Sequence, residues 1–411
     1  MRIGVAQADI TPEPGGELCG FVAREQPSLG VHDRLLATVL YLESGGVCLP
    51  VMHAEVIGHD GDMHKFIWRF EGEYRGWPYM LLTATHTHSG PPSIRLYECG
   101  EYDAAYCARL RDTLYGLFQE ARANAEEAAL VVAEARCDLG IDRRGGPHAH
   151  TDPRLPVLGW KRADGSWVAA AAVYAMHNVA MGPQNRLVSG DVAGEAARRL
   201  SEIIGAPAIF LNGACGNINP PSVGSDFARV DEWGERLAAA AGAALEAAPP
   251  VGDETLRVGG CEWEAARLPA PPEHIAALEA EFAAAGEGPT GDRIRRAFER
   301  WRNEPVEDEV RLCGQTYITV VRLGPIYLAC FDAEVFSHIG DELRAATGLP
   351  VYPVGYANGD VGYVAPEWAY HEGGYETQSA FVYYGTKPIE RGAYEYIRDQ
   401  AAAAIQRLSR A

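Results

Sequence analysis

The sequence contains no apolar run long enough to cross a bilayer and no cluster of Lys or Arg. Its longest apolar stretches, such as residues 167–176, have the length of a strand, whereas a membrane-spanning helix needs about 20 residues. The chain carries 36 Lys and Arg against 56 Asp and Glu, a formal net charge of −20. Duplex nucleic acids and anionic membranes both attract basic surfaces. We therefore expect no membrane span and no nucleic-acid partner.

Paired cysteines and an export signal are also missing. The nine cysteines are odd in number and scattered without a CxxC pair, which favours reduced thiols over a disulfide framework. The first residues reach Asp9 and then Pro12 before an apolar signal-peptide core can form. Both features predict a cytoplasmic protein.

Local motifs that mark common catalytic classes are absent. There is no HExxH metal motif, no GxSxG nucleophile elbow and no Walker loop. Cys215 lies in a glycine-containing segment, but no neighbouring motif activates its thiol, and a small buried cysteine is the commoner state. A catalytic site would therefore have to be assembled by the fold from distant residues.

What the sequence does contain is an alternation of strand-length apolar runs with longer amphipathic segments, which predicts an α/β fold. Residues 36–42 and 47–53 flank a glycine-rich turn, and residues 155–160 and 167–176 flank Asp-Gly, so each pair reads as an antiparallel hairpin. The expected core is therefore a mixed β-sheet flanked by helices.

Helices are predicted where apolar residues recur every three or four positions, as between residues 227 and 241. Two further helical patterns within about 270–304 are separated by a Gly-Glu-Gly-Pro segment and predict a helical hairpin insertion. No linker long enough to separate domains occurs, so we expect a single catalytic domain over residues 1–411.

Polar residues follow several of the buried-looking apolar runs. His86 follows one such run, His177 another and Glu334 a third. Loops beyond the carboxyl ends of strands form the ligand crevice of α/β sheets, and two histidines with a carboxylate are a catalytic zinc set. Taken singly, however, each histidine is better explained by hydrogen bonds to loop backbone. The pattern alone therefore leaves a metal site and a structural role both open.

Five short segments, taken together, resemble the catalytic domain of the neutral/alkaline non-lysosomal ceramidases. They are GVAQADITP (residues 4–12), THTHSGP (85–91), His177 with the later SGDVAG (189–194), NGACGNINP (212–220), and Tyr363-Val364 with Tyr375-Glu376. Their order extends from the first residues to about residue 387. The resemblance implies the ceramidase catalytic-domain fold and a zinc-dependent amidase.

The resemblance also implies roles for individual residues. The zinc ligands would be His86, His177, Glu334 and Tyr363. Residues with catalytic roles would be His88, which contacts substrate, Tyr375, which stabilises the reacting carbonyl, and Arg143. The substrate pocket would include Asn212, Asn217 and Asn219.

The sequence departs from the ceramidase pattern where substrate would bind. Asn219 stands where ceramidases carry a serine, and Asn217 stands where they carry an acid. Because no implied zinc ligand is replaced, we expect amide hydrolysis by metal-activated water on a smaller, soluble N-acyl substrate. Two alternatives remain: an esterase, lactonase or carbamate hydrolase with the same metal centre, and a non-catalytic metal-stabilised protein that binds a small ligand.

Overall fold

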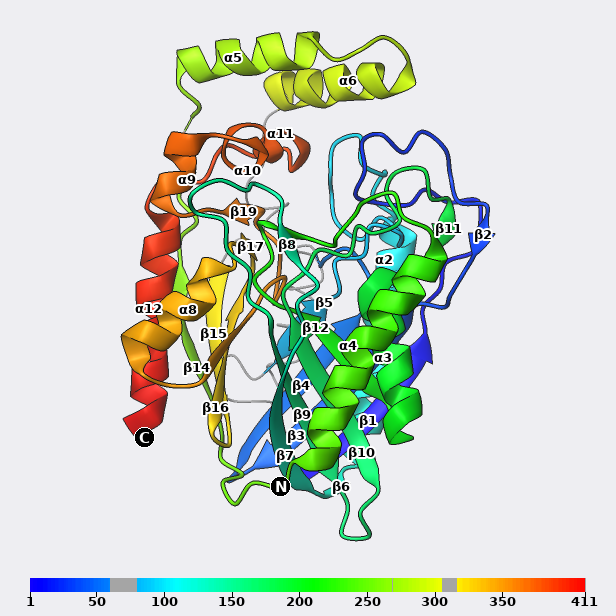
Figure 1. The fold of residues 1–411 in the computed structure, drawn as a ribbon. Helices are drawn as coiled ribbons and strands as arrows, with labels where there is room; N and C mark the ends of the chain where they lie inside the picture. Colours follow the sequence, from blue (N-terminus) through cyan, green and yellow to red (C-terminus); the bar gives the residue numbers. More distant parts are fainter. Residues whose placement is uncertain (60–79, 268, 305–315, 411) are drawn as a thin grey trace.

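The fold is built on three main β-sheets, shown in Figure 1 as strands that run upward from the end of the molecule where the N-terminus lies. The structure is a computed structural model and describes residues 1–59, 80–267, 269–304 and 316–410. The first sheet has the order β5-β4-β3-β1-β6. Its strands are β1 (Arg2–Asp9), β3 (Leu36–Ser44), β4 (Val47–Ala54), β5 (Leu81–Ala84) and β6 (Glu126–Glu127).

The second and third sheets have four strands each, in the orders β12-β10-β9-β7 and β14-β15-β16-β18. The second sheet contains β7 (Ala129–Arg136), β9 (Arg154–Lys161), β10 (Trp167–Tyr174) and β12 (Ala208–Asn212). The third contains β14 (Leu256–Trp263), β15 (Thr316–Leu323), β16 (Ile326–Phe331) and β18 (Val351–Val354).

All three sheets share one strand topology. In each, three strands form consecutive antiparallel pairs, and a fourth strand adds to the edge parallel to the third: β5 to β4, β12 to β10, and β18 to β16. The two parallel strands of each sheet therefore point the same way and end at the same edge. The predicted α/β class with mixed sheets is confirmed, with the strands divided among three sheets.

Three two-stranded pairs lie beyond the ends of the main sheets. They are β2 (Gly30–Val31) with β11 (Leu187–Val188), β8 (Ile141–Asp142) with β13 (Ile218–Asn219), and β17 (Glu334–Val335) with β19 (Tyr363–Val364). The last pair aligns Glu334 directly with Tyr363. This alignment brings two implied metal ligands onto neighbouring strands.

Some helices cover the outer faces of the sheets and others lie beyond the strand ends (Figure 1). They are α2 (Ala104–Ala123), α3 (Asp191–Ile204), α4 (Phe227–Ala247), α5 (Pro272–Ala283), α6 (Pro289–Asn303), α8 (His338–Thr347), α9 (Glu367–Glu372), α10 (Tyr375–Gln378), α11 (Ala380–Tyr383) and α12 (Ala393–Arg410). Helix α2 packs on the first sheet, α3 and α4 on the second, and α12 on the third. In the described part of the chain, no helix is both long and apolar enough to span a membrane.

A shared hydrophobic core joins the three sheets. Residues from each sheet, such as Leu40, Val173 and Leu328, belong to one buried cluster. Apolar burial is the main stabilising contribution to folding, so this cluster fixes how the three sheets sit against one another. The edges at which the parallel strands end are thereby held close together.

Helices α5 and α6 occupy the range in which the sequence predicts a helical hairpin. In Figure 1 they lie at one end of the molecule, above α10 and α11. Phe282 of α5 and Phe298 of α6 pack in a small apolar cluster with Phe381 of α11. Eight cysteines are free thiols in the structure, whereas Cys313 lies outside the described residues.

Candidate metal centre

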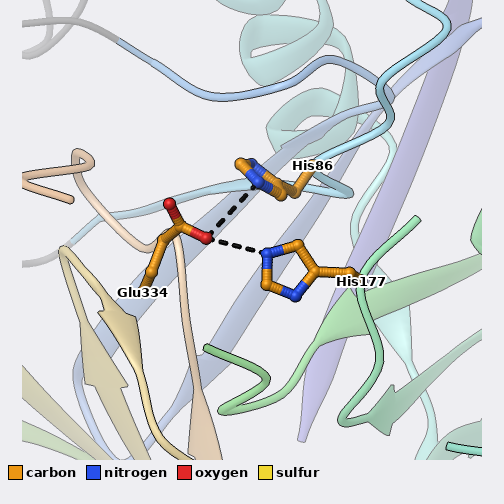
Figure 2. Close-up of side chains that lie close together, drawn as sticks. All are labelled: His86, His177 and Glu334. Carbon is orange, nitrogen blue, oxygen red and sulfur yellow. Dashed lines mark hydrogen bonds and ion pairs between the residues drawn. The ribbon is translucent and has the colours of Figure 1, made fainter. Parts of the chain in front are cut away.

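The three main sheets each contribute one donor to a buried group of His86, His177 and Glu334 (Figure 2). His86 follows β5 of the first sheet, His177 follows β10 of the second, and Glu334 follows β16 of the third. Their ligand atoms all lie within 4.8 Å of one another, and each residue is at most 2% exposed. The carboxyl ends of strands from three sheets thus converge on one point, as the sequence pattern predicts.

Both histidines use Nδ1 for a hydrogen bond to backbone, which leaves Nε2 facing the centre of the group. His86 Nδ1 lies 2.7 Å from the Ile57 carbonyl oxygen, and His177 Nδ1 lies 2.7 Å from that of Cys215. A carbonyl can only accept, so each Nδ1 carries the proton and each Nε2 can offer a lone pair. Histidines that bind metals are oriented in this way.

Glu334 supplies the carboxylate of the group. Its Oε2 lies 2.8 Å from His177 Nε2 and 3.6 Å from His86 Nε2. Burial alone would raise the pKa of Glu334, but the hydrogen bond from His177 and the charges of both histidines lower it to about 2. Oxygen and nitrogen donors of this kind suit zinc, so the residues present fit the metal that the sequence implies.

The two imidazoles differ in their proton affinity. Burial lowers the pKa of His86 to about 4. Burial acts in the same direction on His177, but its contacts with Cys215 and Glu334 outweigh it and raise the pKa of His177 to about 10. Without a metal, a proton therefore stays between His177 and Glu334, and a bound cation would take its place.

His88 lies against the metal group without belonging to it. Its Nε2 is 3.2 Å from His86 Nε2, and its ring packs edge-on against Phe21 with ring centroids 4.9 Å apart. His88 Nδ1 is buried without a hydrogen-bond partner among the described residues. Gly20 has a φ of 109°, and a Cβ there would lie 2.4 Å from His88 Nδ1, so only glycine leaves room for this ring.

Tyr363, Arg143 and Tyr375 form one wall beside the donors. The Arg143 guanidinium carbon lies 5.4 Å from the centre of the Tyr363 ring and interacts with its hydroxyl group. Tyr375 packs edge-on against Tyr363, with ring centroids 5.7 Å apart, and is 44% exposed. Glu376, next to Tyr375, accepts a 2.8 Å hydrogen bond from Arg143 Nε. The structure thus brings the three residues to one side of the centre.

The three asparagines predicted for the substrate pocket have different surroundings. Asn219 Oδ1 lies 3.5 Å from Arg143 and so borders this wall. Asn212 Nδ2 donates to the Thr85 carbonyl at 3.1 Å. Asn217 donates to Asp142 at 2.7 Å and accepts from the Ser337 backbone at 2.8 Å. The amide groups of Asn212 and Asn217 therefore hold loops together, and a substrate role for the three asparagines stays a prediction.

Two tyrosines that the sequence reasoning did not select contact Glu334 directly. The Tyr384 hydroxyl donates to Glu334 Oε1, and the Tyr356 hydroxyl donates to Oε2 at 3.1 Å. Tyr356 follows β18, so its place after a strand end was a usable signal. Tyr384 lies just after the four-residue helix α11, where no motif or periodicity marks it.

Close backbone packing holds the loops of this centre together. Gly216 donates its backbone N–H to the Val335 carbonyl at 2.9 Å. A Cβ on Gly216 would lie 2.6 Å from the Glu334 carbonyl oxygen, nearer than any side chain tolerates. The segment after β12 can therefore reach Glu334 only because this position is glycine.

Comparison with known proteins identifies the class to which this fold corresponds. No family model matches the chain. Across 99% of its length it resembles two solved ceramidase structures: neutral ceramidase from Pseudomonas aeruginosa, with a TM-score of 0.76 and 21% identity, and a ceramidase complexed with C2, with a TM-score of 0.77 and 22% identity. The chain covers 74% and 75% of these two structures. It therefore has the ceramidase fold.

Curated relatives found by sequence similarity are also neutral ceramidases. The chain is 26% identical over 248 residues to neutral ceramidase of Pseudomonas aeruginosa, 25% over 295 residues to that of Mycobacterium tuberculosis, and 23% over 229 residues to that of Drosophila melanogaster. These matches cover 53%, 64% and 49% of this chain. They span only 37%, 45% and 32% of the relatives, less than half of each. The resemblance to neutral ceramidases that the sequence motifs indicate is confirmed.

Proposed function

We propose that this protein is a zinc-dependent hydrolase that cleaves the amide bond of an N-acyl compound. The observation that carries the proposal is the buried group of His86, His177 and Glu334, in which both Nδ1 atoms are tied to backbone carbonyls. The relatives are called neutral ceramidases, and ceramide is an N-acyl lipid. Their name therefore supports an amide as the bond that is cleaved.

His86, His177 and Glu334 would hold the metal, with Tyr363 as a fourth ligand beside Glu334. A bound zinc ion would supply Lewis-acid polarisation of the carbonyl and lower the pKa of a water molecule to about 7. The donors are almost completely shielded from solvent, which strengthens every charge interaction at the centre.

The protein's own residues beside the centre would position the substrate. Tyr375 is partly exposed and its hydroxyl can donate to the oxygen of the reacting carbonyl as negative charge develops there. A donor in such a position is typically worth about 3 kcal/mol. His88 can bind or move a proton at Nε2, since this nitrogen lies 3.2 Å from His86 Nε2. Arg143 would hold Tyr363 and the Tyr375-Glu376 segment in place.

We further propose that the substrate is smaller and more soluble than a long-chain ceramide. Asn219 presents a carboxamide beside Arg143, and this group is bulkier than a serine hydroxyl and both donates and accepts hydrogen bonds. The net charge of −20 disfavours approach to an anionic bilayer. A cytoplasmic location fits such a substrate and stays a prediction.

The test compares kcat/KM for a panel of substrates with the zinc-loaded enzyme. The panel holds a long-chain ceramide in detergent, short N-acyl amines and N-acyl amino acids, together with simple esters, a lactone and a carbamate. We expect the short N-acyl compounds to be turned over fastest, and activity to disappear on chelation and return with zinc. Ceramide as the best substrate would overturn the size assignment, and an ester, lactone or carbamate as the best would overturn the amide assignment. Zinc binding without any single turnover would show a ligand-binding protein.

A further inference from the structure

Tyr356 contacts all three donors of the metal group, although none of the roles above uses it. Its ring stacks on the His86 ring with centroids 4.1 Å apart and planes at 17°. Its hydroxyl lies 3.1 Å from Glu334 Oε2 and 3.4 Å from His177 Nε2. Tyr356 is 1% exposed, so these contacts replace water around the donors.

The backbone at this stacked pair is strained. Tyr356 has a φ of 51° and His86 a φ of 60°, both in the left-handed region that non-glycine residues rarely adopt. The His86 backbone N–H is fixed by a 2.9 Å bond to the Val56 carbonyl, within the loop that follows β4. Strain of this kind persists only where the surroundings enforce it, and it concentrates at functional sites.

The hydroxyl of Tyr356 lies within hydrogen-bond distance of a second acceptor besides Glu334, because Cys215 Sγ is 3.3 Å away. The Glu334 carboxylate is the stronger acceptor, since a hydrogen bond to a charged group is stronger than one to a neutral sulfur. A bond from the phenol to Oε2 occupies one lone pair of the oxygen that faces both imidazoles and leaves the other to His177 Nε2 or, in place of that proton, to a metal. Tyr384 holds Oε1 of the same carboxylate in the same manner.

From this geometry we infer that Tyr356 is a positioning residue of the metal centre: its hydroxyl orients Glu334 Oε2 and its ring fixes the plane of His86. The inference rests on the proposed function, because it requires the donor group to bind a metal. Pre-oriented donors lose less freedom on binding, so the hydroxyl should raise metal affinity. Removing a partner that orients a ligand typically lowers metal affinity roughly 10- to 100-fold.

The test is the zinc affinity of Tyr356→Phe, measured by competition with a chromogenic chelator on metal-free protein at one fixed pH. This substitution keeps the ring and removes the hydroxyl group. We expect affinity to fall roughly 10- to 100-fold and the absorption spectrum of the cobalt-loaded protein to change. The matched control is Tyr106→Phe, which removes a buried hydroxyl of α2 that donates to the Ile10 carbonyl just after β1, outside the metal group. The control should bind zinc as the wild type does.

Each outcome bears on a different claim. Equal zinc affinity and an unchanged cobalt spectrum in Tyr356→Phe would overturn the role of Tyr356 and leave the proposed function intact. A wild-type protein without measurable zinc affinity would instead overturn the proposed function. Should Tyr356→Phe fail to fold, Cys215→Ala serves, because it removes only the competing partner of the Tyr356 hydroxyl: we expect the cobalt spectrum to shift while zinc affinity is kept or rises. A fall in zinc affinity with an unchanged cobalt spectrum would count against the inference.

Discussion

At the residue scale, His86 and His177 each depend on a single nitrogen that is free to bind a metal. With Nδ1 committed to a carbonyl, loss of either ring removes one of three close donors. We expect the wild type to carry about one zinc per chain, and His86→Ala or His177→Ala to lose most of it. Metal analysis after dialysis measures this. The exposed His371 offers a control, since His371→Ala should retain the metal, and full occupancy in the two site variants would exclude the centre.

His88 should behave differently, because it contacts His86 and not Glu334. We expect His88→Ala to retain zinc but to lower kcat by about 10²- to 10⁴-fold, the usual contribution of a group that transfers a proton in the reaction. Measuring kcat and zinc content on the same preparation separates the two effects. Loss of zinc in His88→Ala would mean that this histidine, too, serves as a ligand.

The sequence pattern marked the positions of the donors but left their role open, and only the resemblance to ceramidases implied a metal site; neither indicated Tyr356 and Tyr384 beside Glu334. His86, His177 and Glu334 each follow an apolar run directly, so their positions mark strand ends. The contacts of Tyr384 depend on a loop and a short helix returning to the third sheet, which no periodicity records. Asn217 lies inside a recognisable motif. Only the structure, however, shows that its amide group is hydrogen-bonded to Asp142 and to the Ser337 backbone.

At the element scale, hairpins were the most predictable feature because their signal is local. Gly45 and Gly46, between β3 and β4, have φ values of 59° and 80°, as a tight two-residue turn requires. The division of strands among three sheets depends on which buried faces meet, and that information is not local. The pair β17 and β19 is too short for any pattern to mark, although it sets Glu334 beside Tyr363.

The helical hairpin of α5 and α6 is fastened to the loops near His88 by Arg293. This side chain donates to the Glu98 carbonyl at 3.1 and 2.7 Å and to the Arg24 carbonyl at 2.9 Å. We expect Arg293→Ala to loosen the hairpin, with hydrogen exchange in residues 272–303 rising about tenfold, because bonds from a charged donor stabilise by roughly 1.5–3 kcal/mol.

A second arginine of the same helix provides the control for that prediction. Arg302 is 53% exposed and, among the described residues, its ion pair stays within the hairpin, with Glu279 at 3.0 Å. Arg302→Ala should leave exchange in the hairpin nearly unchanged, since exposed ion pairs contribute little. Equal exchange in the two variants would show that Arg293 does not fasten the hairpin.

At the scale of the whole molecule, one strand topology occurs three times, and each copy ends at the metal centre. No repeat is evident in the sequence, because a sheet's topology constrains only which positions are apolar and not which residue fills them. The donors nevertheless come from the same edge of their sheets, at which the parallel third and fourth strands end: His177 and Glu334 follow third strands, and His86 follows a fourth strand. Any metal bound there would tie the three sheets together and stabilise the folded state.

The stability of the whole molecule should also depend on pH through Glu55, which lies near the junction of the first two sheets. Glu55 is 2% exposed and accepts a 3.2 Å hydrogen bond from the Leu36 backbone. Burial, reinforced by the nearby charge of Asp33, raises the pKa of Glu55 from 4.5 to about 8, although Arg198 acts in the opposite direction. The folded protein therefore keeps Glu55 protonated at pH values where the unfolded chain has released the proton.

The sign follows from linkage between protonation and folding. The contribution of Glu55 to the free energy of unfolding is fully present below about pH 4.5 and is lost as pH rises towards about 8, by up to about 1.4 kcal/mol per pH unit. Glu55→Gln keeps the shape of the side chain and cannot ionise, so its unfolding free energy should fall less steeply across that range. Chemical denaturation of both metal-free proteins at several pH values measures the difference. The contributions of other buried acids to the pH dependence cancel, because both proteins contain these acids. If the unfolding free energies of wild type and Glu55→Gln changed equally with pH, Glu55 would ionise in the folded protein at its ordinary pKa.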